Sequence, residues 1–569
     1  MKIRDFEWWI VGILGLTSFF LAIIGFGFLF AEAGVERNFI DLAFQSVKIF
    51  GMEFVDEFKS PLPWQLEVAR WLAPAVVLYA AGKAIYYFIR REFKSVLIKY
   101  KKDHIIITSL NPKSRYLISD MLAQNEKVIV IAGIEELQKL DLVEKGGAII
   151  VDGDITSNNF LKNIAAHRAK YFVFIEDDDE KNISSAISVY NYLAKYGKDK
   201  RQTLYTHVSD DLKLNELREL NFFEEFTEQN MVNSNCEIRI FSANERTSRI
   251  LFNKYSPDVF TQVCSPDDPQ LHIALIGSKN LAQSMLIRFA RLGHYANLKK
   301  LKITLFHDEK NMVSRLERSF KYLHQLIDLE IVNEELDLFD IDKFEVLHKQ
   351  HPFAAVYIVI EDDSLSSGVL NKLTKVDTQK NMDVILTLLN PDGILSKWYT
   401  AKKIDNINLH KFNLIEESFT KDGLISEKLD ELAKIIHKDY LSSIEKPDPN
   451  KASHQPWELL PLDFKNQNRE QADHIYVKLR ALDYKNNLKN LFNNISKEQI
   501  ELLSEMEHNR WWAHMQLSGY VYAEKRDDKK KRHPNLISYN QLSDDIKQYD
   551  RNTILNIPRL LAIYNNAQT

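Results

Sequence analysis

Cysteine, glycine and proline are scarce in this sequence. Its 569 residues include 2 cysteines, 18 glycines and 15 prolines. Two cysteines are too few for a disulfide-stabilised scaffold, and the low glycine and proline content excludes a collagen-like repeat. Neither sign of charge is in large excess, because 74 basic residues stand against 79 acidic ones. The chain is therefore no polycation, and we expect no nucleic-acid partner.

Long apolar runs are absent from most of the chain, whose mean hydropathy of −0.29 excludes a transporter with many membrane spans. Two runs near the N-terminus are exceptions: residues 8–30 carry no charge, and residues 71–89 carry only Lys83. A helix over the first run would extend about 34 Å, enough to cross a hydrocarbon core of about 30 Å. A cleaved signal peptide is the alternative for this run, but its apolar core is usually only about 7–15 residues long. We therefore predict two membrane-spanning helices.

The charges that flank these runs predict their orientation. Residues 31–70 hold seven acidic side chains against four basic ones. The second run is followed by a basic stretch that contains Arg90, Arg91, Lys94, Lys99, Lys101 and Lys102. Basic flanks stay on the cytoplasmic side of a membrane. We expect an inner (plasma) membrane protein with two spans, and with both termini in the cytoplasm.

The segment between the runs decides between a pore and an anchor. Residues 39–50 have the apolar spacing of a short helix and are followed by Gly51, Met52 and Glu53. Span, short helix, turn and span is an order that resembles a two-span cation-channel subunit. The turn lacks a potassium filter such as TVGYG, but a ring of Glu53 carboxylates would attract cations. A ring of Lys83 would favour anions, and a plain two-helix anchor is the third possibility.

After the basic stretch, short apolar strands alternate with amphipathic helices. Strands are predicted at 104–109, 127–132, 148–152 and 171–176, and again at 272–277, 301–307 and 354–361. Both series contain the letters IEDD after a buried strand. Strand and helix in alternation are typical of a parallel, doubly wound sheet. We predict two such Rossmann-like sheets in tandem, produced by duplication.

The first of these halves resembles the RCK-type domains, which are related to the nucleotide-binding domain of Trk subunits. The resemblance is carried by residues 153–156 (Gly-Asp-Ile-Thr), Leu161, Ala169, residues 177–178 and Asn182. In that family, two-span pores are followed directly by such domains, which form a ligand-gated ring. The resemblance therefore implies a homo-oligomer, with a tetramer as the expected form.

Dinucleotide binding needs a Gly-x-Gly-x-x-Gly turn, so that the backbone can approach the pyrophosphate. Residues 110–115 of the first half contain no glycine, and the second half keeps only the first, Gly277. This disfavours NAD as a cofactor. Gly277, Ser278 and Asp308 remain a possible nucleotide site of the second half. The IEDD acids either hold a divalent cation or lie in a solvated loop, and we favour the loop.

A proline-rich linker at 446–457 precedes a helical module with many aromatic and basic residues. Residues 505–542 contain, in order, a helix, Gly-Tyr-x-Tyr, a basic loop and His-Pro, and this order resembles the RyR domain first recognised in ryanodine receptors. The resemblance implies a sensor of nucleotide-like ligands in bacterial defence. Aromatic rings stack on bases, and guanidinium groups bind phosphates. The candidate ligand-binding residues are Asn468, Arg469, Asp473, His474, His508, Arg510, Trp511, Tyr522, Arg526, Arg532 and His533.

No catalytic motif is present, since the chain lacks a P-loop, an HExxH helix and a Gly-x-Ser-x-Gly elbow. We expect no enzyme and no metal site. The predicted domains are a pore at 1–100, Rossmann-like domains at 101–235 and 236–445, and a sensor at 446–569. Together they predict a subunit of a ligand-gated ion channel with an antiviral or stress role. The alternatives are a non-conducting sensor scaffold anchored in the membrane and, less favoured, an NAD-dependent enzyme.

Overall fold

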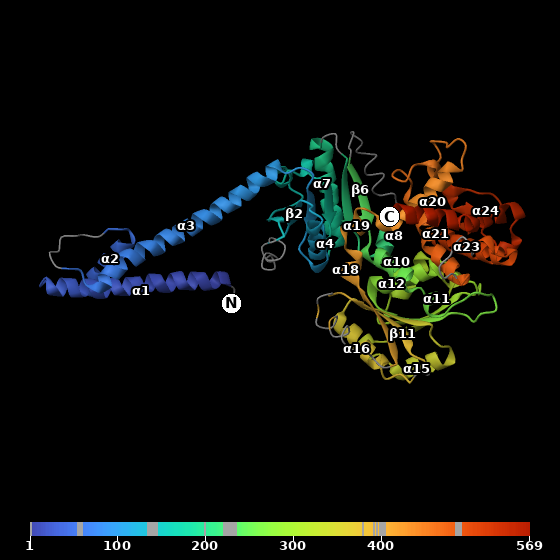
Figure 1. Ribbon diagram of the computed structural model, residues 1–569, viewed down its shortest axis with the longest axis horizontal. Helices are drawn as coiled ribbons and strands as arrows, with labels where there is room; N and C mark the ends of the chain where they lie inside the picture. The colour runs from blue at the N-terminus through green and yellow to red at the C-terminus, as the bar shows by residue number, and fades with distance from the viewer. Residues whose placement is uncertain are drawn as a thin grey trace. The chain divides into compact units, whose positions relative to one another are not determined.

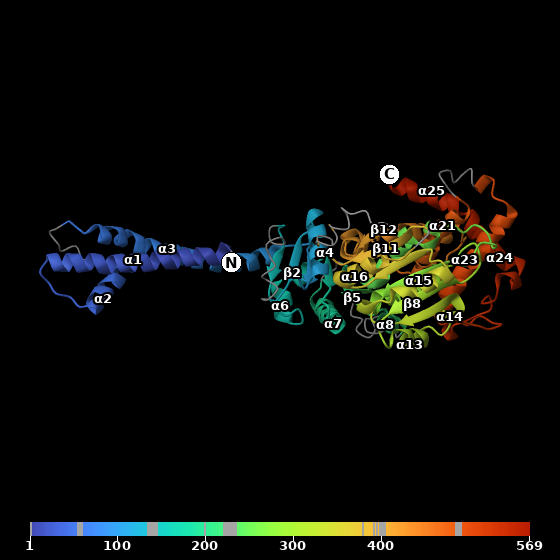
Figure 2. The ribbon, with the colours of Figure 1, turned by 90° about the horizontal axis from the view of Figure 1, so that it is seen from below.

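The structure is a computed structural model in which the chain forms two compact units (Figures 1 and 2). The described residues are 3–53, 61–133, 146–197, 201–219, 236–377, 380–390, 393, 397, 406–483 and 492–568. The first unit consists of residues 1–101 with 163–165, and the second of residues 102–162 with 166–569. Each unit is described by itself.

The first unit contains the helices α1 (Ile3–Glu32), α2 (Phe39–Phe50) and α3 (Trp64–Tyr100). The predicted short helix over 39–50 is present, and the side chain of Asn38 caps it by accepting from the Asp41 N–H at 2.8 Å. Helices α1 and α3 pack through small and apolar side chains. This core consists of Ala22, Phe26, Leu29, Leu66, Ala69 and Ala73, with Ile49 of α2.

Two segments of these helices, Trp8–Glu32 and Trp64–Ile85, are long and apolar enough to cross a membrane. Only 28% and 17% of their most apolar windows are buried within the protein, so neither is the core helix of a soluble domain. The second segment includes Glu67 and Arg70, which pair at 2.9 Å within the helix.

Gly25 permits the close approach of α1 and α3, and this gives a first prediction. A Cβ atom at Gly25 would lie 2.9 Å from both N and Cβ of Leu66, whereas one at Gly12 of the same helix would meet nothing within 4 Å. We expect Gly25→Val to destabilise the helix pair by about 1–3 kcal/mol, because the backbone of α3 must move away. Thermal unfolding of the detergent-solubilised protein measures the effect, with Gly12→Val as the control. Equal melting temperatures for the two variants would contradict this packing.

The second unit contains two six-stranded parallel sheets with the same topology. The first has the order β3-β2-β1-β4-β5-β6 and the second the order β12-β11-β10-β7-β8-β9. Read from the opposite edge, the second sheet repeats the 3-2-1-4-5-6 order of the doubly wound Rossmann fold. The strands are β1 (Ile105–Thr108), β2 (Val128–Ile131), β3 (Ile149–Val151), β4 (Tyr171–Phe174), β5 (Gln202–His207), β6 (Cys236–Phe241), β7 (His272–Gly277), β8 (Leu301–His307), β9 (Ile327–Asn333), β10 (Ala355–Val359), β11 (Met382–Leu388) and β12 (Ile407–Asn413). The predicted tandem fold is confirmed.

Strand β6 belongs to the first sheet, although the predicted second domain begins at 236. It pairs in parallel with β5 from Cys236 to Phe241. Its residues CEIRIF alternate charged and apolar side chains, and all six are half-buried. An edge strand of this kind lacks the continuous apolar run that identifies a central parallel strand. The first sheet therefore extends beyond the predicted boundary.

Helices cover both faces of the second sheet (Figure 1). On one face lie α15 (Ile341–Gln350) and α16 (Asp363–Leu373), whose apolar residues form a core with the alternate side chains of the sheet. On the other face lie α10 (Ala243–Tyr255) and α12 (Lys279–Leu292). The larger core cluster contains residues of both sheets, of these two helices and of the C-terminal helices. The C-terminal module therefore packs on the tandem sheets and shares a hydrophobic core with them.

The C-terminal part consists of α20 (Glu431–Ser442), α21 (Leu462–Ala481), α23 (Lys497–Leu517), α24 (Asp544–Leu555) and α25 (Ile557–Gln568). Helix α12 of the second half contacts both α21 and α23, which are labelled in Figure 1. A mainly helical module was predicted here, and the structure confirms it. Its contact with α12 joins the C-terminal module to the second Rossmann half.

The two IEDD runs have the same structural role. Asp178 and Asp362 accept hydrogen bonds from the first-turn N–H groups of α7 (Asp179–Tyr196) and α16. The following acids, Asp179 and Asp363, accept from backbone N–H groups just beyond β5 and β11, at 2.8 and 2.6 Å. Within the described ranges no cluster of three or more metal-ligating side chains is found. The acids of both runs are used to fix the loops at the carboxyl edge of each sheet.

Candidate ligand site

The C-terminal module places its candidate residues on two helices and a short ribbon. Helix α23 begins at a capping box formed by Ser496 and Gln499. Beyond its end, Gly519 has a φ of +83°, which allows the chain to turn into β13 (Val521–Tyr522). This strand pairs with β14 (Arg532–His533), so the basic loop between them is closed at its base.

The ribbon brings five of the predicted residues together. They are Trp511, Tyr522, Arg526, Arg532 and His533, and we call them the ribbon surface. The His533 ring lies 5.0 Å from the Trp511 ring in an edge-on arrangement and is the register partner of Tyr522. Tyr522 is 57% exposed, and Arg526 and Arg532 are also exposed. Tyr522 and His533 share one face of the ribbon, Arg532 lies on the other face, and Arg526 donates to Asp528 at 2.9 Å. Exposed aromatic and guanidinium groups are the kinds that bind a base or ring attached to a phosphate.

Asp473 and Arg469 of α21 are placed elsewhere, in a buried charge network. Arg249 of α10 donates from Nε to Asp473 Oδ2 at 2.6 Å and from Nη1 to Asp430 Oδ1 at 2.5 Å. Arg469 Nε donates to the second oxygen of Asp430 at 2.9 Å. Although burial alone would raise it, the guanidinium groups of Arg469 and Arg249 hold the pKa of Asp430 well below its usual value. These residues therefore bind one another.

The network continues along α21 to α23. His514 Nδ1 donates to Glu470 Oε2 at 2.9 Å, and its Nε2 donates to Asp463 at 3.2 Å. Although burial alone would lower it, these two carboxylates raise the pKa of His514 to about 9. Arg291 of α12 donates to Glu470 at 3.0 Å. The His514 ring thus joins α23 to α21, and Arg291 joins α21 to the second Rossmann half.

Arg510 and His474 also lie in this interior. Glu507 accepts from Lys478 Nζ at 2.7 Å and from Arg510 Nη2 at 2.6 Å. Although burial alone would raise it, Arg510 and Lys478 lower the pKa of Glu507 to about 2. His474 Nδ1 accepts from Lys478 at 2.8 Å, and its Nε2 donates to the His294 carbonyl at 2.9 Å. We call the buried network Arg249, Asp430, Arg469, Glu470, Asp473, Lys478, Glu507, Arg510 and His514.

The last two predicted residues of the module use their donors internally. His508 is buried, and its Nε2 donates to the Ile537 carbonyl at 2.8 Å. Asn468 is half-buried, and its Nδ2 donates to the Phe464 carbonyl at 2.7 Å. The interpretation of the polar face of α21 as a base-reading face is therefore corrected. That face is polar because it meets the arginines of α10 and α12.

The residues proposed as a nucleotide site of the second half lie at one edge of the sheet. Gly277 ends β7, and a Cβ there would lie 2.6 Å from the Val359 carbonyl oxygen and 3.1 Å from Ala282 Cβ. This glycine is thus required for the packing of β7 against β10 and α12. Ser278 precedes α12, and Asp308 is exposed just beyond the neighbouring strand β8. This position agrees with the crevice in which Rossmann folds bind nucleotides. The single glycine, Gly277, is however needed for the packing of β7 and not for the approach of a phosphate.

The predicted pore residues lie in the first unit. Gly51 ends α2, Met52 has a φ of +62°, and the Glu53 carboxylate lies 3.9 Å from Lys48 Nζ. Glu53 is exposed, as a residue at a pore mouth would be. The Lys83 ammonium lies 5.4 Å from the ring centre of Trp8. A position over an aromatic ring at this distance is typical of a cation–π contact.

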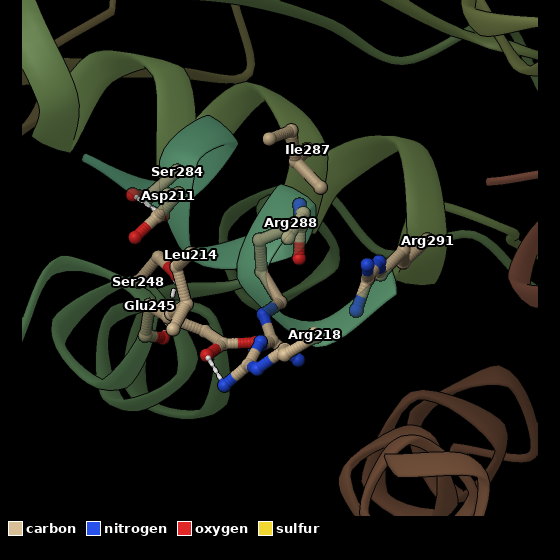
Figure 3. Close-up of a pocket in the computed structure, with 10 residues that line it drawn as sticks. Asp211, Leu214, Arg218, Glu245, Ser248, Ser284, Ile287, Arg288 and Arg291 are labelled. Carbon is tan, nitrogen blue, oxygen red and sulfur yellow. Dashed lines mark hydrogen bonds and ion pairs between the residues drawn. The ribbon is translucent and has the colours of Figure 1, made fainter. Parts of the chain in front are cut away.

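A cavity at the junction of the two Rossmann halves was not predicted (Figure 3). It lies between α8 (Asp211–Glu219), α10 and α12. Its lining residues are Asp211, Leu214, Asn215, Arg218, Glu245, Ser248, Ser284, Ile287, Arg288 and Arg291. None of the predicted site residues is among them. The only sequence signal is the pair of arginines, Arg288 and Arg291, within the otherwise apolar run LIRFARL.

Comparison with family models identifies two segments. Residues 105–222 match the TrkA-N domain, and residues 490–567 match the RyR domain. Both resemblances noted in the sequence are thereby confirmed. No curated protein matches the chain significantly.

Several solved structures are similar over much of the chain. A GsuK structure bound to ADP is 11% identical, covers 73% of this chain and 96% of its own, and has a TM-score of 0.36. The GsuK channel bound to NAD is 11% identical, with coverages of 78% and 86% and a TM-score of 0.37. The human SLO3 gating ring is 9% identical, with coverages of 58% and 85% and a TM-score of 0.39. The fold of this chain rests on its strand orders and its two family matches.

Proposed function

We propose that this protein is a subunit of a homo-oligomeric, ligand-gated ion channel in the inner (plasma) membrane. In this proposal α1 and α3 span the membrane with both termini in the cytoplasm, and four subunits surround the pore. The tandem Rossmann halves form a gating ring, and the ribbon surface senses a nucleotide-like ligand. The protein acts as a binding and conducting device and not as an enzyme. A role in antiviral or stress defence follows from the resemblance to bacterial RyR modules.

The observation that carries the proposal is the buried network between the sensor module and the second Rossmann half. Arg249 of α10 and Arg291 of α12 hold carboxylates of α21, at 2.6 and 3.0 Å. Separating the two charges of a buried ion pair costs much free energy, because each charge is then left unpaired and away from water. A movement of the C-terminal helices must therefore move α10 and α12. This supports transmission of a ligand signal from the ribbon surface into the tandem sheets.

The connection from the sheets to the apolar helices is short. Helix α3 ends at Tyr100, and β1 begins at Ile105. Four intervening residues leave little slack, so a displacement of the first sheet would pull on α3. The ligand opens the pore to the extent that it binds the open ring more tightly than the closed one, by about 1.4 kcal/mol for each tenfold difference in affinity.

Ion flux from liposomes that contain the full-length protein tests the proposal. We expect flux that depends on one member of a panel of linear, cyclic and ADP-ribose-type nucleotides. Tyr522→Ala should raise the half-maximal concentration of that nucleotide about 5–150-fold, because a stacking contact contributes about 1–3 kcal/mol. The matched control is Tyr549→Ala, since Tyr549 is 71% exposed on α24 and lies outside the ribbon surface.

The outcomes separate the alternatives. Nucleotide binding by calorimetry without any flux would favour a membrane-anchored sensor that does not conduct. Flux with an equal shift for both tyrosine variants would move the sensing site away from the ribbon surface. An absence of binding and of flux across the whole panel would refute the proposed function.

A further inference from the structure

The cavity between α8, α10 and α12 is a junction of the two Rossmann halves. Helix α8 follows β5 of the first half, whereas α12 follows β7 of the second (Figure 1). The cavity measures about 20 Å³, which corresponds to about one or two water-sized occupants. It is too small for a nucleotide or a phosphate ester. Its occupant, if specific, is a small ion.

Three arginines converge on this cavity from two helices (Figure 3). Arg218 of α8 donates to Glu245 at 3.0 Å. Arg288 Nη1 lies 3.9 Å from Asp473 Oδ2, beyond hydrogen-bond distance, although Arg288 is only 6% exposed. Among the described residues, the Nε atoms of Arg218 and Arg291 are buried without a hydrogen-bond partner. Two buried N–H donors of half-buried arginines are thus left over at the cavity.

The negative charge available to these arginines is shared with other cations. Asp473 already accepts two hydrogen bonds from Arg249, at 2.6 and 3.0 Å. Glu470, the partner of Arg291, also accepts from His514 at 2.9 Å. Glu245 lines the cavity, and although burial alone would raise it, Arg218 lowers its pKa to about 2. The Glu245 carboxylate, which already accepts from Arg218, therefore faces three guanidinium groups.

Asp211, the second carboxylate of the lining, is only partly ionised near pH 7. One of its carboxylate oxygens accepts from the Ser284 hydroxyl, and the other is buried without a hydrogen-bond partner among the described residues. Burial and the nearby Glu245 raise its pKa to about 7. A protonated Asp211 would be one more donor in the cavity. The balance of the lining is then cationic.

We propose that this cavity binds a halide-sized inorganic anion, of which chloride is the abundant representative. The anion would lie among Arg218, Arg288 and Arg291 and would accept from their free donors and from the Asn215 amide. It would screen the repulsion between the arginine of α8 and those of α12. Occupancy therefore holds the two Rossmann halves together, whatever the ligand of the ribbon surface is.

Thermal unfolding of the full-length protein in detergent tests this site. At constant ionic strength, replacing gluconate with chloride is expected to raise the melting temperature by about 2–4 °C. The rise should reach a plateau at high chloride concentration. Asn215→Leu, which fills the cavity and removes a donor, should abolish this rise. Asn371→Leu, on the exposed side of α16, should keep it. Equal melting temperatures in the two salts, or an unchanged chloride response in Asn215→Leu, would overturn the proposal.

A direct measurement covers the case in which Asn215→Leu does not fold. Crystals of the unaltered protein grown in bromide should show an anomalous peak among the three guanidinium groups. A bromide map without a peak there would overturn the proposal. Neither readout uses ion flux or nucleotide binding, so its failure is separate from failure of the proposed channel function.

Discussion

Asp473→Ala is expected to lower the free energy of unfolding of the second unit by about 3–5 kcal/mol. The substitution leaves Arg249, which donates to Asp473 at 2.6 Å, with only one of its two carboxylate partners. It also removes the carboxylate nearest to Arg288. Both arginines are more than nine-tenths buried, so water cannot replace the lost partner. Urea-induced unfolding, followed by tryptophan fluorescence, measures the loss.

The control for this experiment is Glu458→Ala, which removes an exposed acid near the start of the same module. We expect its effect to stay within about 0.5 kcal/mol. Combining Asp473→Ala with Arg249→Met should cost less than the sum of the two single changes, because the pair shares one interaction. If Asp473→Ala unfolds at the same urea concentration as the control, the network does not stabilise the junction.

The stability of the C-terminal module is expected to fall as the pH rises from about 7 to 10, because His514 loses its proton there. Although burial alone would lower it, the carboxylates of Glu470 and Asp463 raise the pKa of His514 from 6.5 to about 9 in the folded protein. A raised folded-state pKa stabilises the fold fully below 6.5, and the contribution is lost as the pH passes 9. The difference between the unfolded-state pKa of 6.5 and the folded-state pKa of about 9 corresponds to about 3 kcal/mol in the free energy of unfolding.

The measurement is the urea midpoint as a function of pH for the native protein and for His514→Gln. The variant should lose most of the decline above pH 7, since glutamine does not titrate. Burial raises the pKa of Asp550 from 3.8 to about 7. Its titration therefore changes the stability of the fold between pH 3.8 and about 7, which is below the range in which His514 loses its proton. His324→Gln alters an exposed histidine and should keep the native slope. The same slope in the native protein and His514→Gln would contradict the assigned charge state.

Much of the fold was predictable because it follows from local periodicity. Apolar runs identified the two long helices, and buried strands identified β1–β4 of the first sheet and β7, β8 and β10 of the second. The strands β5, β6, β9, β11 and β12 were not predicted. The short helix over 39–50 was predictable from its apolar spacing. Strand β6 was missed because its alternating residues carry no continuous apolar signal.

The candidate site was predictable only in part. The aromatic and basic residues of the ribbon surface were chosen because residue type and order indicate stacking and phosphate contact, and their role in binding stays a prediction. Helix α21 offered the same residue types, yet Asp473 and His474 are buried and bind partners of their own. The cavity of Arg218, Arg288 and Arg291 gave almost no sequence signal, since its residues come from three separate helices.

By itself, the sequence determined which segments are apolar enough to span a membrane, that two doubly wound halves follow, and that an RyR-type module ends the chain. These properties depend on neighbours a few residues apart, which a single chain displays directly. Only the tertiary structure decided which polar side chains face solvent and which face one another. Arg249 and Asp473 are 224 residues apart in sequence and lie in hydrogen-bond contact. Such a pair is created by packing, because the burial that makes its charges strong exists only after the helices have met.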